Sequence, residues 1–186
     1  MAQKFGLAGG QFKLNFVTPK PEFSGADTAK RRAAVNKAIS KGVVKGVGYV
    51  EKGLREALDA AMSSAVWGPS IARIPYKRKN GTVMKAGKLA NLIDSGKLRN
   101  SLELKAKFLQ TKTELAVRYK MPYANMIHYG GVIYPYGNKN GASSVVLPPR
   151  PWVEAVMIGG YGGIERYNPD PDFNKGLQEA WAAQFG

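Results

Sequence analysis

Residues 27–66 read DTAKRRAAVNKAISKGVVKGVGYVEKGLREALDAAMSSAV, and this stretch decides the fold. Its apolar residues recur every three or four positions, which is the spacing of one helix face; they are Val35, Ile39, Val43, Val47, Val50, Leu54, Leu58 and Ala61. Basic residues fall on the opposite side, namely Lys30, Lys37, Lys41, Lys45, Lys52 and Arg55. The pattern predicts one long amphipathic helix with a basic outer stripe, ended by Trp67-Gly68-Pro69 because proline cannot continue a helix.

The length and the glycines of this helix bear on what it packs against. A helix of 40 residues would be about 60 Å long, whereas a compact domain of this size is roughly 40 Å across. Gly42, Gly46, Gly48 and Gly53 lie in its middle and allow either a kink or the close approach of another backbone. Both alternatives favour a helix that packs against a partner subunit.

The segments around this helix alternate or repeat more weakly. Phe12, Leu14 and Phe16 alternate with polar residues inside an extended N-terminal arm, which needs a surface of its own chain or of a neighbouring subunit. Residues 102–108 and 114–119 alternate as two strands of an antiparallel hairpin, residues 145–147 suit a third strand, and residues 172–185 suit a final helix.

The predicted fold class is therefore α+β. A long N-terminal amphipathic helix packs on a small antiparallel sheet, with an extended N-terminal arm, long loops and a C-terminal helix. The predicted organisation is an arm at 1–26, a single α+β domain at 27–157, and a Gly/Pro-rich connector with the C-terminal helix at 158–186.

Charge indicates the chemistry of the partners. The net charge is +15, from 28 basic and 13 acidic residues, and the excess lies in residues 1–120. A field of this size favours anionic partners: nucleic acid, an anionic membrane or an acidic protein surface. The predicted loop 67–93 adds a second basic set, Arg73, Lys77, Arg78, Lys79, Lys85 and Lys88. No apolar stretch is long enough for a transmembrane helix, and residues 1–16 lack the apolar run of a signal peptide, so we expect no membrane partner.

Composition argues against most enzyme chemistry. Without cysteine there is no disulfide, thiolate metal site or cysteine nucleophile, and His128 is the only histidine. His128 is expected in a core or on the surface rather than at a metal. Residues 159–163, GGYGG, lack the Lys-Ser/Thr of a phosphate-binding loop. We expect no enzyme activity, no metal and no cofactor.

Three short motifs follow the basic loop in order. They are Asp94-Ser95-Gly96-x-Leu98-x-x-Ser101, then Tyr123-Ala124 with His128 and Gly130-Gly131, then Pro149-Arg150-Pro151-Trp152. Across residues 27–157 this order resembles the tailed-phage head–tail joining family, also described as tail-completion or virion-morphogenesis proteins.

The resemblance implies a structural protein of the virion neck, found in the virion after assembly in the host cytoplasm. Such subunits form a ring, a hexamer or dodecamer, between portal, adaptor or stopper proteins and the tail-tube or tail-terminator proteins. Either a tail-terminator-like ring or an intermediate neck ring fits the sequence.

Two questions stay open at this level. The basic stripe faces either DNA in the neck channel, through non-specific phosphate contacts, or acidic rings above and below it. Arg150 either receives a neighbour's carboxylate or is a solvated arginine on a rigid turn. The alternative function is a sequence-independent nucleic-acid-binding module, and a small hydrolase is the third reading.

Overall fold

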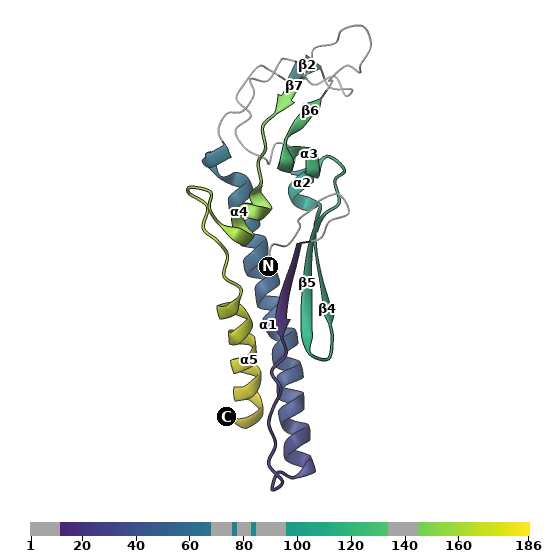
Figure 1. Ribbon diagram of the computed structural model, residues 1–186, viewed down its shortest axis with the longest axis vertical. Coiled ribbons are helices and arrows are strands. Elements are labelled where there is room, and N and C mark those ends of the chain that lie inside the picture. The colour runs from purple at the N-terminus through teal and green to yellow at the C-terminus, as the bar shows by residue number, and fades with distance from the viewer. Residues whose placement is uncertain (1–11, 68–75, 78–82, 85–95, 134–144) are drawn as a thin grey trace. The chain divides into compact units, whose positions relative to one another are not determined.

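The computed structural model describes residues 12–67, 76–77, 83–84, 96–133 and 145–186. The chain forms two compact units, each assembled from three stretches of sequence. We call them the helix–sheet unit (Gln11–Ala57, Glu103–Arg118 and Tyr167–Gly186) and the motif unit (Met1–Gly10, Leu58–Leu102 and Tyr119–Arg166). The fold class is α+β, as predicted, with a long helix, a small three-stranded antiparallel sheet and a C-terminal helix (Figure 1).

The sheet places the N-terminal arm on its own chain. Its strand order is β1-β5-β4, from β1 (Phe12–Val17), β5 (Lys112–Tyr119) and β4 (Leu102–Phe108). β1 and β5 are antiparallel, with Phe12 opposite Val117 and Phe16 opposite Thr113. Because side chains alternate along a strand, these residues share one face, and all four are buried. The described part of the arm therefore needs no neighbouring subunit.

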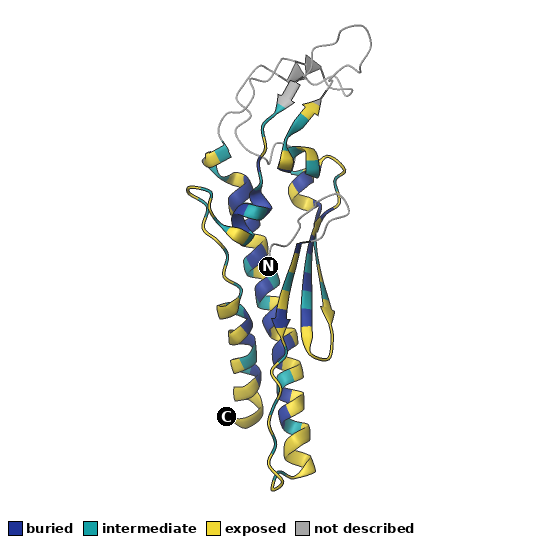
Figure 2. Ribbon diagram, in the orientation of Figure 1, coloured by how far each residue is buried: buried dark blue, intermediate teal, exposed yellow. Residues whose placement is uncertain are grey.

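The long helix α1 (Ala29–Ser63) lies within the predicted span. The Thr28 hydroxyl accepts a hydrogen bond from the Arg31 N–H at 3.3 Å, which caps the start of the helix. Val47, Val50 and Leu54 are buried (Figure 2), as the predicted apolar face requires. A 3₁₀ turn, Ala65–Trp67, follows the helix.

The glycines of α1 admit another helix of the same chain. Gly42 lies against Leu177 and Gly46 against Phe173, so α5 (Asp170–Phe185) runs antiparallel to α1. A Cβ atom at Gly176 would overlap the Gly46 nitrogen, so the two backbones touch where neither residue has a side chain. Of the two predicted roles, close approach is the one found, and at Gly42 and Gly46 the approaching element is α5 of the same chain. The expected packing of the long helix against a partner subunit stays a prediction.

The motif unit consists of short elements. They are α2 (Lys97–Asn100), α3 (Ala124–Tyr129) and α4 (Trp152–Ile158), with two strand pairs: β2 (Tyr76–Lys77) with β3 (Val83–Met84), and β6 (Gly131–Ile133) with β7 (Val145–Leu147). The strand expected at 145–147 exists, but it pairs with β6, and β1 supplies the third strand of the main sheet. Within the described residues, no helix combines the length and the apolar character needed to cross a membrane.

Candidate functional site

The first motif forms a turn that leads into β4. Gly96 has a φ of 68°, a left-handed conformation that favours glycine. Leu98 is buried, and the Ser101 hydroxyl donates to the Leu98 carbonyl oxygen at 2.7 Å. The Lys120 N–H donates to the Ser101 carbonyl oxygen at 3.1 Å. The motif therefore joins the start of β4 to the end of β5.

The second motif supplies buried residues from α3. Ala124 and His128 are buried, whereas Tyr123 is partly exposed. Gly130 has a φ of 76°, and a Cβ atom there would lie 2.7 Å from the Leu147 carbonyl oxygen. Gly130 thus lets the chain that follows α3 pass close to the segment that carries the third motif. Gly131 begins β6.

The third motif packs on the second. The Arg150 N–H lies 3.0 Å from the His128 carbonyl oxygen and donates to it. The Trp152 indole is fully buried. Its ring meets His128 edge-on at a centroid distance of 4.8 Å and Tyr119 at 5.5 Å. Pro149 and Pro151 flank Arg150, and α4 begins directly after them.

The buried histidine is uncharged at neutral pH. Burial lowers the pKa of His128 to about 4, since a low-dielectric surrounding disfavours the charged imidazolium. His128 is therefore an uncharged ring, packed between Trp152 and Tyr129. The described residues contain no group of three or more His, Cys, Asp or Glu side chains that could hold a metal ion.

Arg150 is the one arginine among the buried residues that the structure describes, with 9% of its surface exposed. Burial lowers its pKa, and within the described part of the chain its Nε–H has no hydrogen-bond partner. Its main chain is fixed by the bonds to Ile127 and His128. Of the two alternatives for Arg150, a freely solvated side chain does not fit this burial, and a carboxylate from a neighbour stays a prediction.

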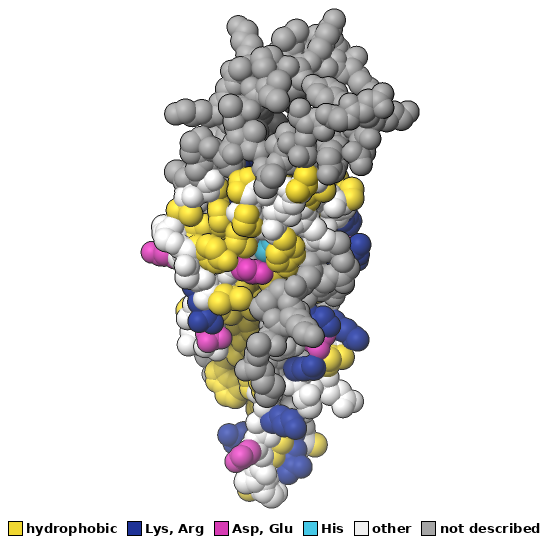
Figure 3. Space-filling view, turned by 45° about the horizontal axis from the view of Figure 1, so that its top comes forward, with side chains coloured by type: hydrophobic (Ala, Val, Ile, Leu, Met, Phe, Trp, Pro, Cys, Tyr) yellow, Lys and Arg dark blue, Asp and Glu magenta, His cyan; other side chains and the backbone are white. Residues whose placement is uncertain are grey.

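The basic stripe lies in the helix–sheet unit. All six of its members on α1 are exposed, namely Lys30, Lys37, Lys41, Lys45, Lys52 and Arg55. Dark blue side chains of lysine and arginine are visible in the lower part of Figure 3. Lys45 is tied to α5, because its ammonium group lies 2.5 Å from the Glu179 carboxylate, which also accepts a bond from the Tyr49 hydroxyl at 2.9 Å. This contact lowers the pKa of Glu179 and raises that of Lys45.

Several predicted residues lie outside the described part. They are Arg73, Arg78, Lys79, Lys85, Lys88, Asp94 and Ser95, together with the side chain of Lys77. The structure therefore brings the second and third motifs together through His128, Arg150 and Trp152. It also links Ser101 of the first motif to Lys120 by a main-chain hydrogen bond. Of the predicted basic loop, only β2 and β3 lie within the described residues.

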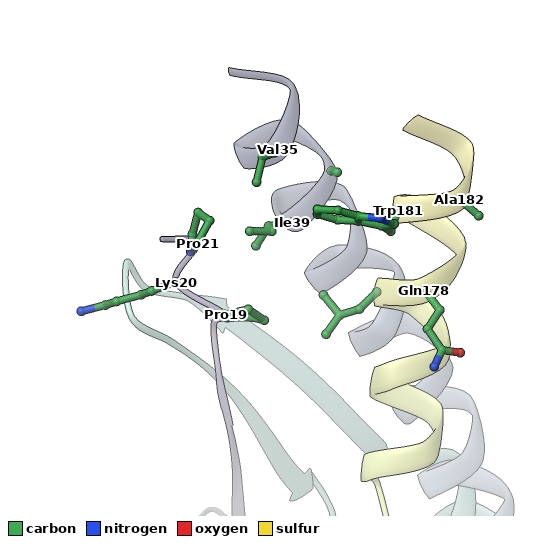
Figure 4. Close-up of a pocket in the computed structure, with 10 residues that line it drawn as sticks. Pro19, Lys20, Pro21, Val35, Ile39, Gln178, Trp181 and Ala182 are labelled. Carbon is green, nitrogen blue, oxygen red and sulfur yellow. The ribbon is translucent and has the colours of Figure 1, made fainter. Parts of the chain in front are cut away.

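An apolar groove that the sequence did not reveal lies in the same unit as the basic stripe. Pro19 and Pro21, before α1, face Val35 and Ile39 of α1 and Trp181 of α5 across this groove (Figure 4). The four-residue spacing of α5 placed Trp181 on the same face as Phe173. The spacing alone does not indicate that α1 covers only the first part of this apolar face of α5.

The motif cluster is buried and held by ring contacts and main-chain bonds, whereas the groove and the basic stripe are exposed. No protein-family model, curated protein or solved structure matches this chain.

Proposed function

We propose that this chain is a structural, non-enzymatic subunit of a ring at the head–tail junction of a tailed bacteriophage. It would join portal, adaptor or stopper proteins to the tail around the DNA channel, within the virion. Its mechanism is geometric: folded subunits present fixed surfaces to copies of themselves and to the adjoining rings.

One observation carries the proposal. The motifs on which the family resemblance rests lie far apart in sequence, yet Ser101, His128 and Trp152 belong to a single packed unit. His128 and Trp152 are in direct contact, and Lys120, next to the second motif, bonds to Ser101. Packing of this kind supports a role for the three motifs in maintaining the fold. The role that the family resemblance implies for them is also architectural.

The test is a phage that carries a premature stop codon in this gene. We expect DNA-filled heads and separate tails that do not join, and joining restored by the wild-type protein supplied in trans. Quantitative mass spectrometry of wild-type particles should find the chain at the copy number of one hexameric or dodecameric ring. Normal joining without the protein, or its absence from finished particles, would refute the proposal.

The basic half of α1 favours a second candidate, sequence-independent binding of nucleic acid. Residues 29–45 contain six lysines and arginines and no acidic residue, and phosphate contacts by such residues weaken steeply with salt. A gel-shift titration separates the two candidates. Tight binding of DNA by the isolated protein at physiological salt, lost with Lys37→Glu and Lys41→Glu, would favour this second function.

A further inference from the structure

The apolar groove of the helix–sheet unit lies beyond the tight crossing of α1 and α5. At the crossing, Gly46 and Gly176 bring the two backbones together. Further along, larger side chains line an open groove of about 500 Å³ between the two helices and the segment before α1 (Figure 4). We call it the α1–α5 groove; its apolar walls include Pro19, Pro21, Val35, Ile39, Leu177 and Trp181.

Trp181 is the centre of this surface. Trp181 is 49% exposed, and it lines both the α1–α5 groove and a second hollow of about 550 Å³. Phe185, which is 45% exposed, borders the second hollow and packs against Trp181 at a ring distance of 4.6 Å. Two neighbouring aromatic side chains that are about half exposed are typical of the anchor residues that protein interfaces bury.

The rim of this apolar surface is positively charged. Lys20 lines the α1–α5 groove, and Lys30 lines the second hollow. Neither lysine forms an ion pair with the described residues, and neither do Lys37 and Lys41 further along α1. Arg31, beside Lys30, is offset by Asp27 at 3.2 Å. An apolar centre with a basic rim is complementary to a ligand with apolar side chains and carboxylates.

We propose that the α1–α5 groove binds an acidic amphipathic helix of a partner protein. The partner's apolar side chains, three and four residues apart, would pack on Trp181 and Ile39, with carboxylates near Lys20 and Lys30. This is the helix-in-groove mode of recognition.

The other occupants fit the surface less well. A second copy of the chain would bring the same lysines face to face in a symmetric pair, and like charges oppose that contact. A DNA duplex would pair its phosphates with the lysines but would leave the aliphatic walls uncovered. An anionic membrane suits apolar groups that project outward, whereas Val35 and Ile39 line a hollow.

The inference deepens the proposed function and rests on it only for where the partner is found, which would be an adjoining ring. The groove itself is argued from the described residues. A binding test on the isolated full chain therefore stands apart from the phage experiment, and either result can fail without the other.

The test measures binding of labelled synthetic peptides to the purified full-length protein by fluorescence anisotropy. The probe is a helix of about 18 residues, or five turns, with leucine at helical spacing and glutamate at the exposed positions. Two comparison peptides replace glutamate with lysine or scramble the spacing. We expect the acidic amphipathic probe to bind at least tenfold more tightly than either one, a difference of about 1.4 kcal/mol.

Paired variants locate the site. Trp181→Ala should weaken binding of the acidic probe at least tenfold, whereas Phe108→Ala, which removes an aromatic side chain that is 50% exposed on β4, should change it less than twofold. Lys20→Glu with Lys30→Glu should also weaken it tenfold. The matched reversal of the exposed residues Lys52 and Lys107 should have a smaller effect.

Circular dichroism checks that each variant is folded, and the lysine reversals keep the test decisive if Trp181→Ala unfolds. Equal binding of the three peptides, or equal effects of Trp181→Ala and Phe108→Ala, would overturn the proposal. Binding of phosphatidylglycerol vesicles, single-stranded DNA or a second copy that depends more strongly on Trp181 would also overturn it, in favour of that occupant.

Discussion

Replacing Gly176 with alanine tests the contact that holds α1 and α5 together. The new Cβ atom would overlap the nitrogen and Cα atoms of Gly46 and would lie 2.8 Å from the Lys45 carbonyl carbon, whereas ordinary contact begins at 3.4 Å. These are main-chain atoms of a helix and cannot rotate away, so the two helices must separate by about 1 Å, a shift that forfeits much of the dispersion energy between them.

The size of the effect follows from two opposing terms. Overpacking of a tight contact costs about 1–3 kcal/mol, and this site belongs at the upper end because backbone meets backbone. Alanine improves helix propensity by about 1 kcal/mol. We expect Gly176→Ala to lower the free energy of unfolding by about 2 kcal/mol. Gly48 lies in α1 at a position where an added Cβ atom would meet nothing within 4 Å, so Gly48→Ala should raise that free energy by up to about 1 kcal/mol.

Urea unfolding followed by far-ultraviolet circular dichroism measures both variants, since the midpoint reports stability when the slope is unchanged. The two substitutions are chemically identical, and only their surroundings differ. If Gly176→Ala stabilised the protein as Gly48→Ala is expected to, the close crossing of the two helices would be wrong.

Three further predictions concern both units. His128 stays neutral in the folded chain down to about pH 4, whereas in the unfolded chain it takes up a proton below about pH 6.5. The free energy of unfolding should therefore fall as the pH drops through this window, by about 3 kcal/mol in total. In urea titrations, His128→Phe should abolish this pH dependence between about pH 6.5 and 5. Gly130→Ala should lower the free energy of unfolding by more than about 2 kcal/mol, because Gly130 has a positive φ and its Cβ atom would clash with the Leu147 carbonyl oxygen. Gly162→Ala is the control, since a Cβ atom there would meet nothing within 4 Å. Equal stability of the two variants would contradict the prediction. Tyr167→Phe removes a 2.6 Å hydrogen bond to Asp172 and should cost about 1 kcal/mol in thermal unfolding.

Much of the fold could be predicted because single elements carry their own periodicity. The apolar spacing from Val35 to Leu58 specifies a helix wherever its partner lies, and the alternation around Leu115 and Val117 specifies a half-buried strand. The periodicity of an element does not specify which other element it packs against. Phe12 and Phe16 alternate in the same way whether they pair with their own β5 or with a neighbour's strand.

The site was harder to predict for the same reason. Trp181 and Phe173 occupy equivalent positions in the repeat of α5, yet Phe173 is buried and stacked on Phe16 at 4.6 Å, while Trp181 is half exposed. Which of them is covered depends on where β1 and α1 lie in space. The motif residues His128 and Trp152 are both buried. The sequence predicted a core or surface position for His128 but could not choose between the two, because that choice also depends on where the neighbouring segments lie.

The pairing of β1 with β5 and the stacking of Phe16 on Phe173 have a consequence for synthesis of the chain. The first described strand meets its sheet partner about a hundred residues later, and its aromatic contact only when α5 has left the ribosome. Contacts this distant in sequence form late in folding. A nascent or prematurely terminated chain would lack Leu177 and Trp181, hence the α1–α5 groove, and would expose the glycine-lined side of α1. The groove that we propose as a binding site would thus exist only after translation of the whole chain is complete.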